Sequence, residues 1–189
     1  MKKTTFWGTI LLAGCLTLSI SSLAWGDSRS DDGGSYGLWS QKGTALPVMN
    51  KAYQNECAAC HFAYPASFLP ARSWVKIMGT LENHFGENAE LDAAGRQEIE
   101  QYLTAQAGDQ APSRFSRSFM RAIDSADTPL RISETAYFQR EHRKVPAGLV
   151  TGNAKVRSFS NCASCHTGAD KGSFNEHGIV IPGHGRWED

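Results

Sequence analysis

The pattern C-x-x-C-H occurs twice in the sequence, as CAACH at residues 57–61 and as CASCH at residues 162–166. This spacing is typical of covalent c-type haem attachment, in which each thiol forms a thioether bond with a haem vinyl group. Two intervening residues make about one helical turn, so both sulfurs lie on one side of a short helix. The histidine that follows then lies against one face of the porphyrin, where its imidazole is the proximal iron ligand. The two motifs therefore predict two covalently bound haem c groups.

Other kinds of cysteine chemistry fit these motifs poorly. A zinc site built from two C-x-x-C pairs usually places them about 15–20 residues apart, whereas 101 residues separate Cys60 from Cys162. A thioredoxin-like dithiol requires a βαβ context, and no strand pattern of that kind surrounds either motif. The two motifs use every cysteine of the chain except Cys15, which lies in an N-terminal leader.

Residues 1–26 have the composition of an export signal. A basic start is followed by an apolar stretch, and the small residues Ala24 and Gly26 stand at the positions that a signal peptidase inspects. The residues around Cys15 also resemble a lipobox, which would make the protein a lipoprotein. We favour cleavage after Gly26. The apolar run continues past Cys15 to Leu23, whereas the residues that follow the cysteine of a lipoprotein are usually polar. Haem is attached to such motifs outside the bacterial cytoplasmic membrane, so the sequence predicts a periplasmic protein.

The charge balance after the leader narrows the choice of partners. Cleavage would leave 17 Lys and Arg against 19 Asp and Glu, a net charge of −2. Nucleic acid is therefore not an expected partner, since it favours a strongly basic face. No later apolar run approaches the roughly 18 residues that a membrane-spanning helix needs, so we expect no transmembrane segment after signal cleavage.

Composition and helical spacing predict the organisation of the chain. Residues 27–44 are rich in Asp, Gly and Ser and are predicted to be a flexible lead-in. An N-terminal cytochrome c-like haem domain is expected at residues 45–106 and a C-terminal haem domain at residues 107–189. The expected fold class is mainly α, with two small helical haem domains and much irregular loop.

The candidate for the sixth ligand of the first haem is His84. Apolar residues recur at offsets of three and four through residues 72–85 and predict one amphipathic helix; they are Trp74, Ile77, Met78, Leu81 and Phe85. His84 follows Leu81 by three positions and so continues this stripe, which would direct it toward the haem. Two alternatives stay open at this point, a core histidine bonded to a carbonyl, and Met78 as the ligand.

The candidate for the second haem is His142. Asp92 is expected to cap a helix that runs to about Gln106, residues 113–123 predict another helix, and Ser133 can cap a third that runs to about Lys144. His142 lies four residues after Phe138 and shares its face of that third helix. Charged neighbours leave a solvated histidine open as the alternative. His177 and His184, in the glycine-rich tail at residues 168–189, compete for the same position.

Several strings resemble the dihaem cytochrome c family that is often called DHC. These are the two haem motifs, LENHFGENAELD at residues 81–92, QREHRKVP at residues 139–146, and the closing SNCASCH that continues into GSF. The similarity covers most of residues 45–182. The resemblance implies a periplasmic electron carrier with two bis-histidine haems, in which His61 pairs with His84 and His166 pairs with His142. It also implies two partners, an oxygen-binding monohaem cytochrome of the sphaeroides haem protein type and a membrane cytochrome b.

The function expected from the sequence is electron transfer without enzymatic activity. Two axial imidazoles leave no iron position for a substrate, and they give a lower potential than a histidine–methionine pair. A peroxidase-like dihaem enzyme with an open iron, and an electron-input subunit of a periplasmic reductase, remain alternatives. The cofactor-binding candidates are Cys57, Cys60, His61, His84, Cys162, Cys165, His166 and His142, of which the four histidines are the iron ligands. The basic cluster of Arg140, Arg143 and Lys144 beside His142 is the candidate docking patch. The alternative is a solvated helix end, where basic residues also interact favourably with the helix dipole.

Overall fold

The structure, a computed structural model, describes residues 50–188, which belong to one compact unit of the chain. The predicted export signal, the lead-in and Cys15 lie outside the described residues. We call residues 50–106 the N-terminal segment and residues 107–188 the C-terminal segment. The predicted division into two haem domains at this boundary stays a prediction.

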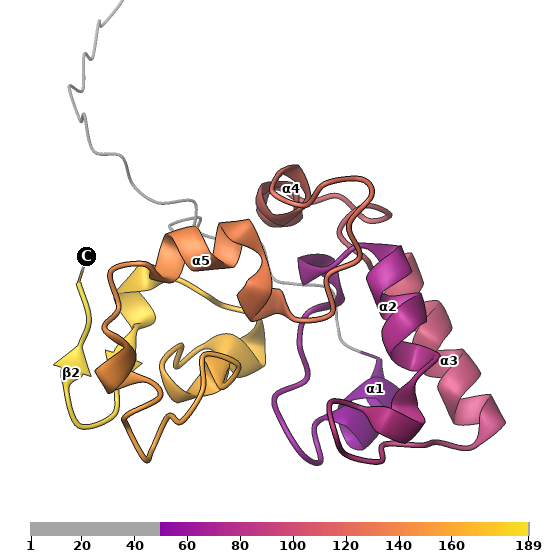
Figure 1. The fold of residues 1–189 in the computed structure, drawn as a ribbon, viewed down its shortest axis with the longest axis horizontal. Coiled ribbons are helices and arrows are strands. Elements are labelled where there is room, and N and C mark those ends of the chain that lie inside the picture. The colour runs from indigo at the N-terminus through magenta and orange to yellow at the C-terminus, as the bar shows by residue number, and fades with distance from the viewer. Residues whose placement is uncertain (1–49, 189) are drawn as a thin grey trace, which may run out of the picture. The chain divides into compact units, whose positions relative to one another are not determined.

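Three helices make up the frame of the N-terminal segment (Figure 1), and they are α1 (Lys51–Cys57), α2 (Ala71–Met78) and α3 (Ala93–Ala105). The side chain of Asn50 caps α1 by accepting a hydrogen bond from the Tyr53 amide. Asp92 caps α3 as expected, and accepts from the amides of Ala94 and Gly95. Helix α3 packs against both α1 and α2. Helix α1, whose last residue is Cys57 of the first haem motif, is thus packed against the last helix of the N-terminal segment.

The predicted helix at residues 72–85 is wrong in its second half. Helix α2 ends at Met78 with Gly79 as its C-cap, and a separate 3₁₀ turn follows at Leu81–Asn83. Glycine lacks the side chain that would favour continuing the helix. The apolar face itself is as predicted, because Trp74, Ile77 and Met78 are all buried. His84 therefore follows a 3₁₀ turn and does not lie on a helix face.

The C-terminal segment contains two helices, α4 (Arg114–Arg121) and α5 (Ala136–His142), and otherwise consists mostly of 3₁₀ turns and loops. A capping box of Ser113 and Ser116 starts α4. The expected cap of α5 at Ser133 is wrong, since the Thr135 side chain accepts from the Phe138 amide. The glycine-rich tail is irregular as expected, except for an antiparallel pair of short strands, β1 (Val180–Ile181) and β2 (Gly185–Arg186).

Aromatic side chains from both segments share one core. Phe68 of the N-terminal segment lies with its ring centroid 4.8 Å from that of Phe119 in α4 and 5.2 Å from that of Phe174. Phe119 in turn meets Tyr137 of α5 at 4.7 Å. All four side chains are buried, and burial of large aromatic rings is a strong source of stability. Within residues 50–188, no helix is long and apolar enough to cross a membrane.

Candidate haem sites

The first C-x-x-C-H motif lies at the C-terminal end of α1. Cys57 is the last residue of the helix and is half-buried, whereas Cys60 is exposed. His61 Nδ1 lies 2.7 Å from the backbone oxygen of Phe62. Because a carbonyl oxygen can only accept, Nδ1 is the donor, and Nε2 is left unprotonated for a metal. None of the four described cysteines is paired in a disulfide, so all four sulfurs are available for thioether bonds.

His84 faces His61 across the first site. The ring centroids are 6.1 Å apart and the ring planes differ by 18°. Metal–imidazole nitrogen bonds are about 2 Å long at zinc, and the ring centre lies about 1 Å beyond the nitrogen, so two imidazoles that share one metal have centroids about 6 Å apart. The separation of His61 and His84 thus fits one iron between them. Met78, the alternative ligand, is buried in the core.

A tight turn holds His84 in place. The His84 amide donates to the carbonyl of Glu87 at 2.7 Å, and the His84 carbonyl accepts from the Glu87 amide at 3.2 Å, which makes a two-residue turn. Its central residues, Phe85 and Gly86, have φ angles of 56° and 104°, as a type I′ turn requires. A phenylalanine is unusual at positive φ, and such conformations gather at ligand clamps. The guanidinium of Arg131, from the C-terminal segment, lies 4.0 Å from the centre of the exposed Phe85 ring.

The second motif begins on a 3₁₀ turn, Cys162–Ser164, instead of an α-helix. His166 is tied to the C-terminal tail by a β-bridge to Ile179. Its ring centroid lies 6.1 Å from that of His142, the same separation as at the first site, but the two ring planes differ by 72°. The separation again fits one iron between two imidazoles.

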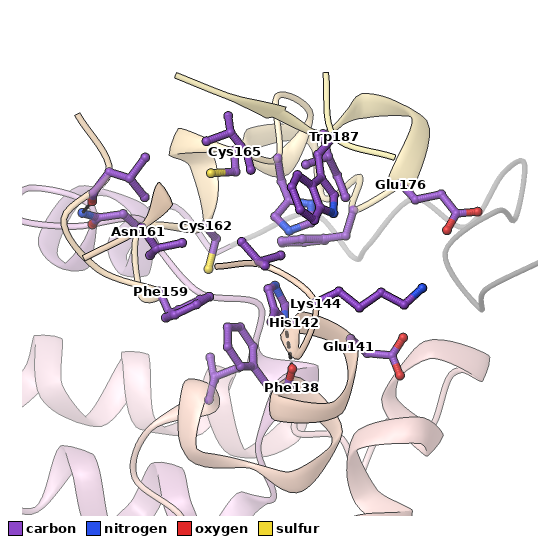
Figure 2. A pocket seen from close by; sticks show the side chains of 18 of the residues that line it. Phe138, Glu141, His142, Lys144, Phe159, Asn161, Cys162, Cys165, Glu176 and Trp187 are labelled. Carbon is purple, nitrogen blue, oxygen red and sulfur yellow. Dashed lines mark hydrogen bonds between the residues drawn. The ribbon is translucent and has the colours of Figure 1, made fainter. Parts of the chain in front are cut away.

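Helix α5 positions His142. Its Nδ1 donates to the carbonyl of Phe138, four residues earlier, at 2.8 Å. The ring also lies on the Phe138 ring, with centroids 3.8 Å apart and planes within 11°, and it meets the edge of Phe159 at 6.0 Å. Figure 2 shows His142 between Phe138 and Cys162. The His142 ring is partly buried and packs against two aromatic rings, so the alternative of a solvated histidine does not describe it.

A cavity of about 630 Å³ lies at the second site, within the usual range of 300–1,000 Å³ for small-molecule and cofactor pockets. Both His142 and His166 line it together with both motif cysteines. Its apolar wall is made by side chains from both segments; these are Phe68, Phe119, Ile132, Phe138, Val145, Val150, Val156, Phe159, Phe174, Ile179 and Ile181. Glu141, Lys144, Glu176 and Trp187 also line the cavity (Figure 2). An apolar wall with a few charged groups suits a haem, which has an apolar ring and charged propionates.

The protonation of these side chains also fits haem. Burial, together with the neighbouring His142, lowers the pKa of His166 to about 4. Burial, His61 and Arg131 lower the pKa of His84. The neutral imidazole is the form that binds a metal. Burial raises the pKa of Cys57 and of Cys162 to about 11, an apolar setting that suits an uncharged thioether.

The two competing histidines lie elsewhere. His177 is exposed at a 3₁₀ turn, Glu176–Gly178, and also lines the second cavity, whereas the ring that faces His166 at 6.1 Å is that of His142. His184 is exposed in the turn between β1 and β2, with its ring 5.9 Å from Trp187. The sequence did not point to Arg131 or Trp187 as parts of the sites. Arg131 is distant in sequence from Phe85, and neither Arg131 nor Trp187 belongs to a motif.

Two covalent attachment motifs, each with a facing pair of imidazoles, define a mainly helical c-type cytochrome with two haems. Comparison with known proteins agrees, because residues 53–174 match the family of dihaem cytochrome c, DHC. The chain belongs to this family and binds two haem c groups covalently. A comparison with curated proteins finds no match.

Solved structures of the same kind are similar to this chain. The dihaem cytochrome c from Shewanella baltica is 42% identical, with a TM-score of 0.61, over 74% of this chain and 98% of its own. The dihaem cytochrome c from Rhodobacter sphaeroides is 49% identical, with a TM-score of 0.62, over 69% of this chain and all of its own. These matches confirm the predicted fold class, the predicted cofactors and the family resemblance.

Proposed function

We propose that this protein carries electrons in the periplasm, with each iron bound by two histidines. His61 and His84 would bind the first iron, and His166 and His142 the second. The observation that carries the proposal is the facing pair of imidazoles at each motif, with the same centroid separation of 6.1 Å. An iron with two imidazole ligands has no position left for substrate, so it exchanges electrons and does not bind a reactant.

The chain's own residues tune this chemistry, while the haem supplies the iron that changes its oxidation state. Nδ1 of His61 and Nδ1 of His142 each donate to a backbone carbonyl. Such bonds fix the tautomer and make the imidazole a better donor to the metal. The buried aromatic side chains Phe68, Phe138 and Phe174 line the second site, and an apolar surrounding of this kind reduces the reorganisation that accompanies a change of charge.

Spectroscopy of the purified, haem-loaded protein tests the ligand assignment. Both ferric haems should be low-spin, without the weak near-infrared sulfur-to-iron band that methionine ligation gives. A high-spin fraction near one haem equivalent, or rapid binding of cyanide to one haem, would favour a peroxidase-like enzyme with an open iron. Mass spectrometry of the same sample should find a mature chain that begins at Asp27 and carries two haems.

We further propose that a redox partner with an acidic face docks beside the second haem. Arg140, Arg143 and Lys144 are exposed, and Lys144 also lines the second cavity. The C-terminal segment has eleven Lys and Arg against eight Asp and Glu. A transient redox contact is small, so local charge steers the encounter. Family resemblance makes an oxygen-binding monohaem cytochrome and a membrane cytochrome b the first partners to test.

Charge reversal tests this docking face. The double variant Arg143→Glu with Lys144→Glu should slow electron transfer to the partner at low salt, and the difference should shrink as salt screens the charges. A matched control is Lys51→Glu with Lys76→Glu, which changes the net charge equally on exposed residues of the N-terminal segment. Equal slowing in both variants, or none in either, would place docking elsewhere, such as the first haem's edge near Phe62 and Tyr64.

A further inference from the structure

Tyr64 contacts residues of both haem sites. Its ring centroid lies 5.0 Å from that of His61, with planes within 26°. Its hydroxyl donates a hydrogen bond of 2.9 Å to the backbone oxygen of Ser160, which is 96 residues away in sequence. Ser160 stands two residues before the first cysteine of the second motif. One side chain thus connects the proximal histidine of the first site to the attachment point of the second.

The oxygen of Ser160 extends this connection to the second haem. The same oxygen lies 3.6 Å from Cys162 Sγ, the sulfur that bonds to the porphyrin in a c-type haem. The chain of contacts therefore runs from the His61 imidazole to the phenol ring, through its hydroxyl to the Ser160 oxygen, and on to the Cys162 sulfur. Each step is a direct contact between neighbouring groups.

The surroundings hold Tyr64 in this place. The Tyr53 hydroxyl donates to the backbone oxygen of Tyr64 at 2.8 Å, and Phe62 packs edge-on against its ring at 5.7 Å. The Tyr64 hydroxyl is fixed at the other end of the ring by the hydrogen bond to the Ser160 oxygen. The side chain is thus kept in one orientation, as a connection between two cofactors requires.

A second, longer connection runs through phenylalanine rings. Phe62 lies 6.3 Å from Phe174, and Phe174 lies 5.3 Å from His166. Its centroid separations exceed the 5.0 Å between Tyr64 and His61. Tyr64 therefore offers the tighter connection between the two sites.

We propose that Tyr64 is the bridging residue through which the two haems exchange an electron within one molecule. One iron is oxidised from ferrous to ferric as the other is reduced from ferric to ferrous, and no atom or proton moves. Tyr64 is neither oxidised nor deprotonated, but couples His61 to Cys162 by contact. The proposal rests on the proposed electron-carrier function, and it explains how an electron that enters at one haem can leave at the other.

Exchange NMR of the half-reduced protein tests this bridge without any partner. Haem methyl resonances distinguish the two half-reduced states, and their cross-peaks and line widths give the rate of exchange. Measurement at two protein concentrations separates exchange within one molecule from exchange between molecules. The variants are Tyr64→Phe, which keeps the ring but loses the hydrogen bond, and Tyr64→Leu, which loses both. Tyr102→Phe is the matched control, because Tyr102 packs against Tyr53 within the N-terminal segment.

Intramolecular exchange should be several-fold slower in Tyr64→Phe, slower again in Tyr64→Leu, and unchanged in Tyr102→Phe. The midpoint potentials of Tyr64→Phe should stay close to those of the wild type, which separates loss of coupling from a structural change. If Tyr64→Leu does not mature, Tyr64→Phe alone decides. Wild-type exchange in Tyr64→Phe, with both haems low-spin, would overturn the bridge. The electron-carrier proposal is tested separately, by the spectrum of the wild-type protein.

Discussion

The two haem sites reach the same separation between facing imidazoles by different structural means. At the first site, the motif ends an α-helix, and His84 follows it on a tight turn. At the second, the motif begins on a 3₁₀ turn, and His142 precedes it at the end of α5. The imidazole planes differ by 18° in one site and by 72° in the other. The motif thus specifies attachment and the proximal histidine, whereas the facing histidine can come from either side of it in sequence.

The segments around the two sites also differ in charge. The N-terminal segment has four Lys and Arg against seven Asp and Glu, whereas the C-terminal segment has eleven against eight. Their net charges are therefore −3 and +3. A positive surrounding favours the reduced form of a haem, since reduction lowers the positive charge of the iron. The total charge is near neutral because the two segments have opposite net charges, so the electrostatic surroundings of the two haems differ.

Removal of a facing histidine should have the largest effect and should act on one site alone. His84→Ala and His142→Ala should each convert one of the two haems to a high-spin form, because an alanine cannot bind iron. The ferric absorption spectrum and electron paramagnetic resonance measure the high-spin fraction. His177→Ala is the control and should leave both haems low-spin. If His177→Ala gives a high-spin haem and His142→Ala does not, His177 is the ligand.

Electron paramagnetic resonance of the wild-type ferric protein should distinguish the two sites. Two iron d orbitals interact with the imidazole rings. Nearly parallel ring planes make the energies of these orbitals differ, whereas nearly perpendicular planes leave the two energies close together. The first haem should therefore give a rhombic low-spin signal, and the second a strongly anisotropic signal with one large g-value. His84→Ala should remove the rhombic signal and His142→Ala the anisotropic one. Two identical rhombic signals would contradict the difference between the ring planes.

The sequence predicted features that depend on local chemistry. The motifs predicted the cofactor, and Asp92 marked the start of α3, because capping depends on neighbouring backbone amides. The cap predicted at Ser133 was wrong by two residues, since Thr135 caps α5. The sequence also pointed to His84 but assigned it to a helix, since the apolar spacing continues past Gly79 while the helix does not. The contact between Arg131 and Phe85 could not be predicted, because it depends on how segments distant in sequence fold together.

The phenylalanines beside the two facing histidines should differ in their contribution to stability. Phe138 is 8% exposed and lies flat on His142, whereas Phe85 is 46% exposed and meets His84 edge-on at 4.8 Å. Phe138→Ala should lower the free energy of unfolding by about 3–5 kcal/mol, the usual cost of removing a buried ring. Phe85→Ala should cost about 1 kcal/mol, because it loses mainly the contact with Arg131. Denaturant unfolding of the haem-loaded variants gives both values, and equal costs would contradict the difference in burial.

Substitution of Arg131 should have the smallest effect, and it should be confined to the first haem. Its guanidinium lies over the Phe85 ring beside His84, and its side chain is about half exposed, next to Glu134. Arg131→Gln should lower the free energy of unfolding by about 0.5–1 kcal/mol, as expected for an exposed cation–π contact. It should also lower the potential of the first haem, because the loss of a nearby positive charge favours the ferric form.

Two further variants separate charge from packing at this position. Arg131→Lys keeps the charge but loses the planar group, so the potential should stay near the wild-type value while part of the stability is lost. Arg143→Gln removes an exposed charge of the C-terminal segment close to His142, and should leave the first haem unchanged. The shift in Arg131→Gln should decrease as salt rises, since exposed charges are screened. If Arg131→Gln shifted the potentials of both haems equally, the net charge, and not the position of Arg131, would set the potential.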